Sequence, residues 1–130
     1  MDPNADAADR SNLRRGLERA VEGLTYPSDA DHPFRVRVEA DGRGHAFTPA
    51  QFLAFLGESE NRGPIEEQPA KVFFDELTFS PGLVELHRLL EARLIGLQVF
   101  RIGRVNVEIH IVGRTESGDV AVLSTRSLET

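Results

Sequence analysis

The fold is decided by residues 97–112, which read LQVFRIGRVNVEIHIV. Gly103 and Arg104 interrupt two runs rich in β-branched and aromatic residues, a composition typical of strands. A glycine at the first of two central turn positions permits the type II′ turn that matches the twist of antiparallel strands. The pattern therefore predicts a tight hairpin in which Ile102 lies opposite Val105.

The polar residues of this hairpin fall on one predicted face. In the register set by a two-residue turn, Arg101 shares a face with Glu108 and His110. Residues 119–127 read as a third strand, which leaves residues 128–130 as a short free end. Three consecutive strands are therefore expected in the C-terminal third of the chain.

Upstream of the hairpin the chain carries helical patterns and one strand pattern. Apolar residues at helical spacing follow Ser11, and Thr48-Pro49 and Ser80-Pro81 each place proline after a hydroxyl N-cap. Residues 58–71 combine glutamates with glycine and prolines, which is typical of an acidic surface loop. The expected elements before the hairpin are helices over 11–22, 49–56 and 81–94 and a strand over 34–39.

The order of these elements favours a single mixed domain. Helices and one strand followed by three consecutive strands predict an α/β layered domain with a largely antiparallel sheet, and 130 residues is the length of one domain. Residues 1–10 contain three aspartates and no apolar periodicity, so a flexible acidic tail is predicted there. The expected organisation is a tail over 1–10 and a domain over 11–130.

Composition and charge exclude several classes of protein. The chain has no cysteine, which excludes disulfides, thiolate zinc sites and cysteine nucleophiles. Its net charge of −6 disfavours general nucleic-acid binding. No apolar stretch approaches the ~20 residues of a membrane helix, and the acidic start lacks the pattern of a secretory signal. We expect a cytoplasmic protein that binds neither membranes nor nucleic acid directly.

The four histidines raise the question of catalysis, and none of them lies in a known catalytic motif. Glu108 and His110 point the same way along one strand and could bind a metal or transfer a proton. A purely structural interpretation pairs Glu108 with Arg101 across the hairpin. We expect the protein not to be an enzyme and to use no cofactor.

Two oxygen-rich segments are candidates for binding. Asp29 and Asp31 lie between the first helix and the first strand, and loops held by rigid elements are common recognition surfaces. Glu129 and Thr130 place several oxygen donors after the last strand, and such clusters suit hard cations such as Mg²⁺. On the residues alone, a solvated loop and a frayed terminus remain the alternatives.

Parts of the sequence resemble a known family. Residues 99–130, which read VFRIGRVNVEIHIVGRTESGDVAVLSTRSLET, resemble the C-terminal half of the cyanobacterial nuclease A inhibitors, including the final Glu-Thr. Residues 20–34, which read AVEGLTYPSDADHPF, and Thr48-Pro49 are similar to the matching N-terminal stretches. The resemblance spans residues 17–130, with a shorter stretch between Phe74 and Pro81 that lacks the tryptophan of that family.

The resemblance implies a single-domain, three-layer α-β-α fold of the pathogenesis-related-1-like type. The implied function is inhibition of a sugar-nonspecific, Mg²⁺-dependent ββα-metal endonuclease of DNA and RNA, in a 1:1 complex that blocks the active site. In that family an acidic loop residue and the C-terminal threonine approach the nuclease's Mg²⁺. These positions fall on Asp29 and Thr130, with Asp31 and Glu129 as further partner-binding residues.

A second function stays open on the sequence. The protein could be an acidic protein-protein interaction module that uses residues 58–67 to bind a partner other than a nuclease. In either case we expect the chain to hold no metal of its own.

Overall fold

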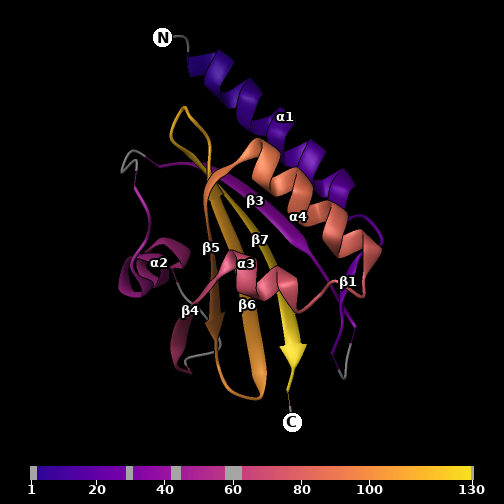
Figure 1. The fold of residues 1–130 in the computed structure, drawn as a ribbon. Helices are drawn as coiled ribbons and strands as arrows, with labels where there is room; N and C mark the ends of the chain where they lie inside the picture. Colours follow the sequence, from indigo (N-terminus) through magenta and orange to yellow (C-terminus); the bar gives the residue numbers. More distant parts are fainter. Residues whose placement is uncertain (1–2, 29–30, 42–44, 58–62, 130) are drawn as a thin grey trace.

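A five-stranded antiparallel sheet forms the centre of the molecule (Figure 1). The computed structural model describes residues 3–28, 31–41, 45–57 and 63–129. The strand order is β3-β7-β6-β5-β4, and a separate two-stranded sheet pairs β1 with β2. The strands are β1 (Thr25–Tyr26), β2 (His32–Pro33), β3 (Arg35–Ala40), β4 (Ile65–Pro69), β5 (Ile95–Ile102), β6 (Asn106–Arg114) and β7 (Asp119–Leu128).

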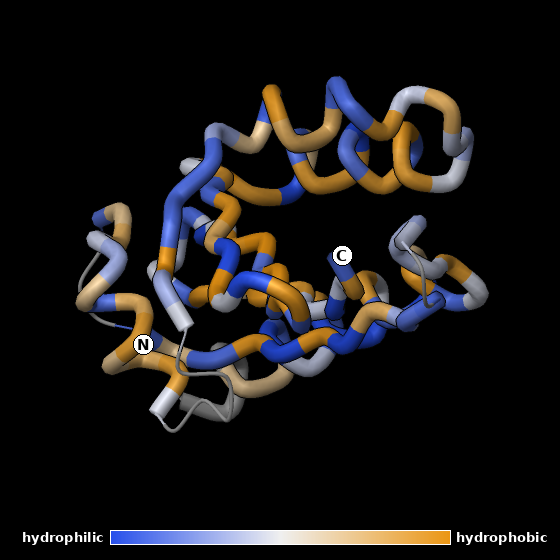
Figure 2. Tube along the Cα trace, turned by 90° about the horizontal axis from the view of Figure 1, so that it is seen from below, coloured by the Kyte–Doolittle hydropathy of each residue, from blue (hydrophilic) through white to orange (hydrophobic). Residues whose placement is uncertain are grey.

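Helices pack on both faces of this sheet. Three of them contribute to the core on one face, and α2 packs on the other. Hydrophobic and hydrophilic positions alternate every few residues along the helices (Figure 2), as expected for helices with one buried side. Within the described part of the chain, no helix has the length and apolar character needed to cross a bilayer. The helices are α1 (Pro3–Val21), α2 (Pro49–Leu56), α3 (Ala70–Asp75) and α4 (Pro81–Arg93).

The larger hydrophobic core lies between the sheet and the helices α1, α3 and α4. Leu17 of α1 and Leu90 of α4 are buried together with Ile109 and Leu123 of the sheet. Burial of side chains of this size contributes roughly 1.5–3 kcal/mol each. The predicted apolar stripe after Ser11 is therefore confirmed as the buried face of α1.

The smaller core lies on the opposite face, under α2. The ring of Phe52 stacks on Phe100 of β5 with 4.5 Å between ring centroids, and both side chains are fully buried. Val112 and Val122 complete this core on β6 and β7. The helix covers only part of the face, because α2 has eight residues and the sheet extends beyond it toward the C-terminal end of β7.

The start of α2 follows the predicted capping pattern. The backbone N–H of Gln51 donates to Oγ1 of Thr48 at 3.2 Å, and the backbone N–H of Thr48 donates to Oε1 of Gln51 at 3.0 Å. Pro49 occupies the first turn, where its missing N–H costs nothing. This reciprocal capping box fixes where the helix over the smaller core begins.

We expect the substitution Thr48→Ala to destabilise the fold by about 1 kcal/mol, because it removes the hydroxyl that caps α2. The measurement is the midpoint of urea unfolding. The control is Thr78→Ala, which truncates an exposed threonine in the turn before α4. Equal midpoints for both variants would show that the cap contributes nothing to stability.

The predicted register of the β5–β6 hairpin is wrong. Ile102 pairs with Glu108 rather than with Val105, so the connection is longer than two residues, and Val105 is exposed. The reason is that β5 is buried on both sides, with Val99 in the larger core and Phe100 in the smaller one. A strand that is apolar on both faces gives no alternation from which the register can be deduced.

Two further boundaries differ from the prediction. α1 begins at Pro3 rather than at Ser11, so residues 3–10 are helical where a tail was expected; proline and acidic residues are favourable in the first turn of a helix. Within the predicted acidic loop over 58–71, the structure forms the edge strand β4, in which Pro69 is tolerated because an edge strand needs fewer backbone donors.

Candidate functional site

The end of β7 is joined to the hairpin formed by β1 and β2 (Figure 1). The backbone N–H of Leu128 donates to Oγ of Ser28 at 3.2 Å. The buried hydroxyl of Thr125 donates a shared hydrogen bond to the carbonyl oxygens of His32 and Pro33, at 3.1 and 3.0 Å. These contacts hold Ser28 and the strand β2 against the last residues of β7.

The structure describes two of the four residues predicted to bind a partner. Asp31 is exposed immediately before β2, and Glu129 follows β7. They belong to the two segments that the Leu128–Ser28 hydrogen bond joins. Asp29 and Thr130 lie outside the described residues, so the roles predicted for them stay predictions.

Glu129 is not part of a free end. Its backbone N–H donates to the carbonyl of Val105 at 2.8 Å, and its carboxylate forms an ion pair with Arg101. The prediction of a free end over 128–130 is therefore wrong for its first two residues. The reason is that β7 extends to Leu128, which pairs with Asn106 at the start of β6.

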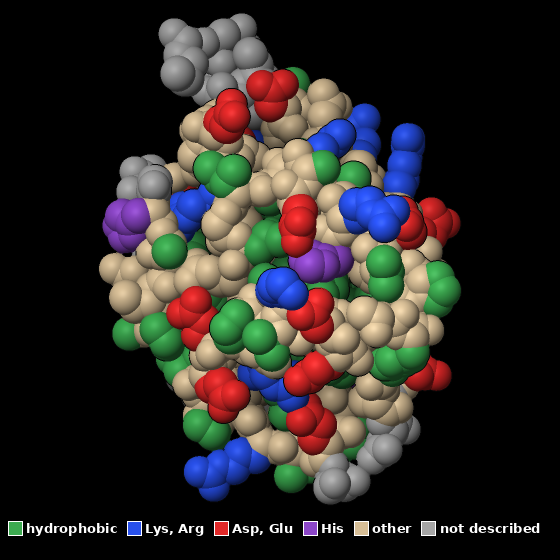
Figure 3. Space-filling view, in the orientation of Figure 1, with side chains coloured by type: hydrophobic (Ala, Val, Ile, Leu, Met, Phe, Trp, Pro, Cys, Tyr) green, Lys and Arg blue, Asp and Glu red, His purple; other side chains and the backbone are tan. Residues whose placement is uncertain are grey.

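Carboxylates surround this end of the sheet. An open depression of about 400 Å³ is lined by Glu66 and Glu67 of β4, by Glu76 after α3 and by Glu129. Arg101 is the basic residue of the lining. In Figure 3, acidic side chains gather around a basic one in the lower part of the molecule, toward the end that carries the C-terminus in Figure 1. This excess of negative charge suits a positively charged partner.

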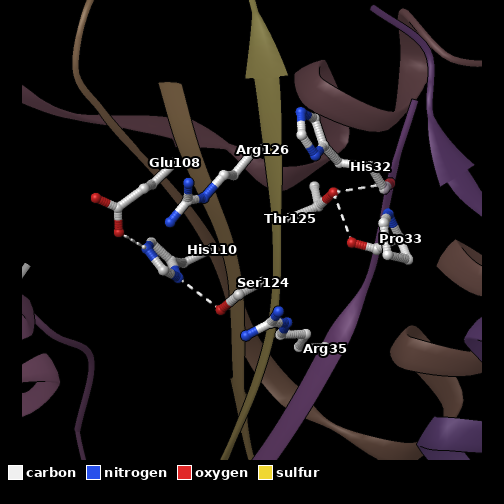
Figure 4. Close-up of a pocket in the computed structure, with 8 residues that line it drawn as sticks. All are labelled: His32, Pro33, Arg35, Glu108, His110, Ser124, Thr125 and Arg126. Atoms are coloured by element: carbon white, nitrogen blue, oxygen red, sulfur yellow. Dashed lines mark hydrogen bonds and ion pairs between the residues drawn. The ribbon is translucent and has the colours of Figure 1, made fainter. Parts of the chain in front are cut away.

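A second depression of about 350 Å³ lies on the sheet face that α2 leaves partly open (Figure 4). In it, Nδ1 of His110 lies 2.6 Å from Oγ of Ser124, and Nε2 lies 3.2 Å from Oε1 of Glu108. Since a carboxylate only accepts hydrogen bonds, Nε2 carries the proton that faces Glu108. In the neutral ring, Nδ1 then accepts the hydroxyl proton of Ser124.

The predicted pairing of Glu108 with Arg101 is wrong. The register differs from the predicted one by an odd number of residues, which moves the two side chains to opposite faces of the sheet. Arg101 instead binds Glu129, and Glu108 contacts His110. The predicted juxtaposition of Glu108 and His110 is confirmed.

Four other residues of this pocket were not identified from the sequence: Arg35, Ser124, Thr125 and Arg126. Ser124 lies directly opposite both Arg35 on β3 and His110 on β6. Their prediction requires the strand order, because these positions lie together only when β7 is placed between β3 and β6.

The described residues contain no ready metal site. Over residues 3–28, 31–41, 45–57 and 63–129, no group of three or more His, Cys, Asp or Glu side chains is arranged to hold a metal ion. The carboxylate-lined depression around Glu129 and the pocket around His110 are two surfaces on which a function can be built.

Comparison with known families distinguishes between the two predicted functions, a nuclease inhibitor and an acidic interaction module. The family model described as nuclease A inhibitor-like protein matches residues 11–130. The chain belongs to this family. The match confirms the resemblance of residues 17–130 to nuclease A inhibitors. No curated protein sequence matches the chain.

Membership in the nuclease A inhibitor-like family gives the role in general terms. The protein is a nuclease inhibitor, and its partner is a nuclease. Such a role consists of binding rather than catalysis, in keeping with the prediction that the chain is not an enzyme.

Proposed function

We propose that this nuclease A inhibitor-like protein blocks the active site of a sugar-nonspecific, Mg²⁺-dependent ββα-metal endonuclease. The β1–β2 loop and the end of β7 enter the active site together. Asp29 and the carboxylate of Thr130 approach the nuclease's Mg²⁺, directly or through water, and Asp31 and Glu129 contact the surrounding enzyme. The complex is 1:1, and the inhibitor contributes no cofactor.

The observation that supports this proposal best is the hydrogen bond from Leu128 to Ser28. It joins two segments that lie 100 positions apart in the sequence. Asp29 follows Ser28 directly, and Thr130 is two residues after Leu128. Because one residue spans at most ~3.5 Å, the chain length allows Asp29 and Thr130 to reach a single cation near this hydrogen bond.

The charge of the protein favours the same target. A nuclease active site is built to hold polyphosphate, so an acidic protein is attracted to it electrostatically. The inhibitor carries a net charge of −6, and Glu66, Glu76 and Glu129 surround the end that would enter. Carboxylates can occupy positions around Mg²⁺ and offer no bond that the enzyme could cleave.

We further propose that the fold is the three-layer α-β-α fold of the pathogenesis-related-1-like type. The packing of α1, α3 and α4 on one face of the sheet and of α2 on the other supports it. In this arrangement the sheet is the middle layer, and the segments proposed to inhibit the nuclease lie at the end of the sheet where β7 ends.

A titration of nuclease activity tests the proposed inhibition. Activity is expected to fall to near zero at about one inhibitor per enzyme. Undiminished activity of the cognate ββα-metal nuclease at a large excess of the protein would reject the proposal. Capture of a non-nuclease protein at 1:1 from the source cell would instead favour the acidic interaction module.

An exposed aromatic residue lies beside the proposed interface. Phe79 is 67% exposed in the turn between α3 and α4. The turn passes next to β1 (Figure 1), and α3 contacts β1 through Tyr26 and Phe73, whose rings stack 6.0 Å apart. Large aromatic residues that become buried when a complex forms contribute much of the binding energy.

We expect Phe79→Ala to weaken inhibition by about 30-fold, which corresponds to ~2 kcal/mol of binding free energy. Stability should change by less than about 0.5 kcal/mol, because the side chain is exposed. The measurement is the inhibition constant together with the thermal midpoint. The matched control is Ile95→Ala, which removes an exposed apolar side chain at the start of β5; equal inhibition constants for the two variants would exclude Phe79 as an anchor.

A further inference from the structure

The pocket around His110 has an ordered arrangement that the proposed inhibition does not use. One row of side chains crosses three neighbouring strands, with Arg35 on β3 opposite Ser124 on β7, and Ser124 opposite His110 on β6. In the next row, Arg126 lies opposite Glu108. The two rows form a continuous polar surface with concave shape on the sheet face that α2 leaves open.

The two arginines of the pocket are available for a ligand. Arg35 and Arg126 form no ion pair with any residue among 3–28, 31–41, 45–57 and 63–129. Their positions are diagonal neighbours on adjacent strands, about 7–8 Å apart at Cα. Figure 4 shows the side chain of Arg35 beside the Ser124 hydroxyl and that of Arg126 on the other side of the His110 ring, near Glu108. Two guanidinium groups at this spacing can bind one small anion between them.

The remaining polar groups of the pocket are held in place. Glu108 accepts from His110, and the ring of His110 lies 5.4 Å from the ring of Phe52, which closes the pocket toward α2. Only 6% of His110 is exposed. The imidazole ring therefore lies between the carboxylate of Glu108 and the hydroxyl of Ser124. An anion that contacts Arg35 would lie on the Ser124 side of this ring.

We propose that this pocket binds the phosphate monoester group of a small molecule. Arg35 and Arg126 each donate a forked pair of N–H groups, and their two positive charges match the near-dianionic charge of a phosphate monoester at neutral pH. A carboxylate carries one negative charge and satisfies only one of the two guanidinium groups. Free phosphate and the phosphate of a mononucleotide share the chemistry that the pocket recognises.

The test is an NMR titration of the whole protein at constant ionic strength. The probes are inorganic phosphate, a nucleoside 5′-monophosphate, the same nucleoside without phosphate, and acetate. Both phosphate compounds are expected to shift the resonances of His110 and of the arginine Nε groups, with a Kd on the order of 1 mM for inorganic phosphate. A tighter Kd for the nucleotide would identify a nucleotide ligand, and an equal one would show that the phosphate alone is bound.

Charge-neutral variants locate the binding. Arg35→Gln and Arg126→Gln are each expected to weaken phosphate binding by about tenfold. Arg15→Gln, which removes an exposed arginine from α1 outside the pocket, should leave the affinity unchanged.

Several results would overturn the proposal: acetate or the nucleoside binding as well as phosphate, the absence of shifts at His110, or equal affinities for the three arginine variants. The measurement requires no nuclease, so its outcome is independent of the proposed inhibition.

Discussion

Removal of Thr130 is expected to weaken inhibition of a ββα-metal nuclease by about 30-fold or more. The proposed contact places an oxygen ligand next to Mg²⁺ in a desolvated active site, where loss of one partner of a charge pair costs ~2–5 kcal/mol. Extension of the chain beyond Thr130 by a tag should have a similar effect, because it removes the free carboxylate. The measurement is the inhibition constant of each variant against the same nuclease.

Two further variants and a stability measurement serve as controls for the removal of Thr130. Asp29→Ala should weaken inhibition less than removal of Thr130, because we expect the contact with Mg²⁺ to be made mainly by the terminal residue. Glu116→Gln, which neutralises an exposed carboxylate in the turn between β6 and β7, should have almost no effect. Unfolding midpoints should agree among all variants. If all of them inhibit equally well, the contact with Mg²⁺ is wrong, although inhibition itself could still stand.

Replacement of Phe52 by alanine is expected to destabilise the protein by ~3–5 kcal/mol, a large part of the ~5–15 kcal/mol that a domain of this size has. Phe52 is the fully buried residue of α2 and stacks on Phe100 of β5. The cavity left behind would lie beside His110, whose ring packs against Phe52 at 5.4 Å.

Urea unfolding measures this loss, and the chemical shifts of His110 report whether the pocket changes with it. Phe55→Ala is the matched control, because Phe55 lies on the same helix and is only partly buried. A loss below about 1 kcal/mol for Phe52→Ala would show that α2 contributes little to the stability of the sheet.

Local signals in the sequence predicted most of the helices correctly. The capping box at Thr48 and the Ser80-Pro81 pair mark the starts of α2 and α4, because hydroxyl caps act through backbone groups only three residues away. The start of α1 was missed because helix formation before Ser11 required no apolar periodicity. The acidic edge strand β4 was missed because its pairing partner is β5, some 30 positions later in the chain.

The contacts of the candidate site that the sequence did not predict join residues that lie far apart in the chain. The juxtaposition of Glu108 and His110 follows from alternation within one strand and was predicted. The contacts of Arg101 with Glu129, and of His110 with Ser124, depend on the register between strands and were not. The proximity of Ser28 to Leu128 depends on the complete fold, although the resemblance to nuclease A inhibitors had already indicated that both segments serve one function.

The position of β7 between β3 and β6 has a consequence for biosynthesis. Until residues 119–128 have left the ribosome, β3 has no partner on that side and β6 presents an open edge. A product of premature translation termination before residue 119 would keep two unpaired strand edges, which favour aggregation, and would lack the β7 residues Thr125 and Leu128 that bind β2 and Ser28. We therefore expect truncated products to be removed by cellular proteases rather than to act as weak inhibitors.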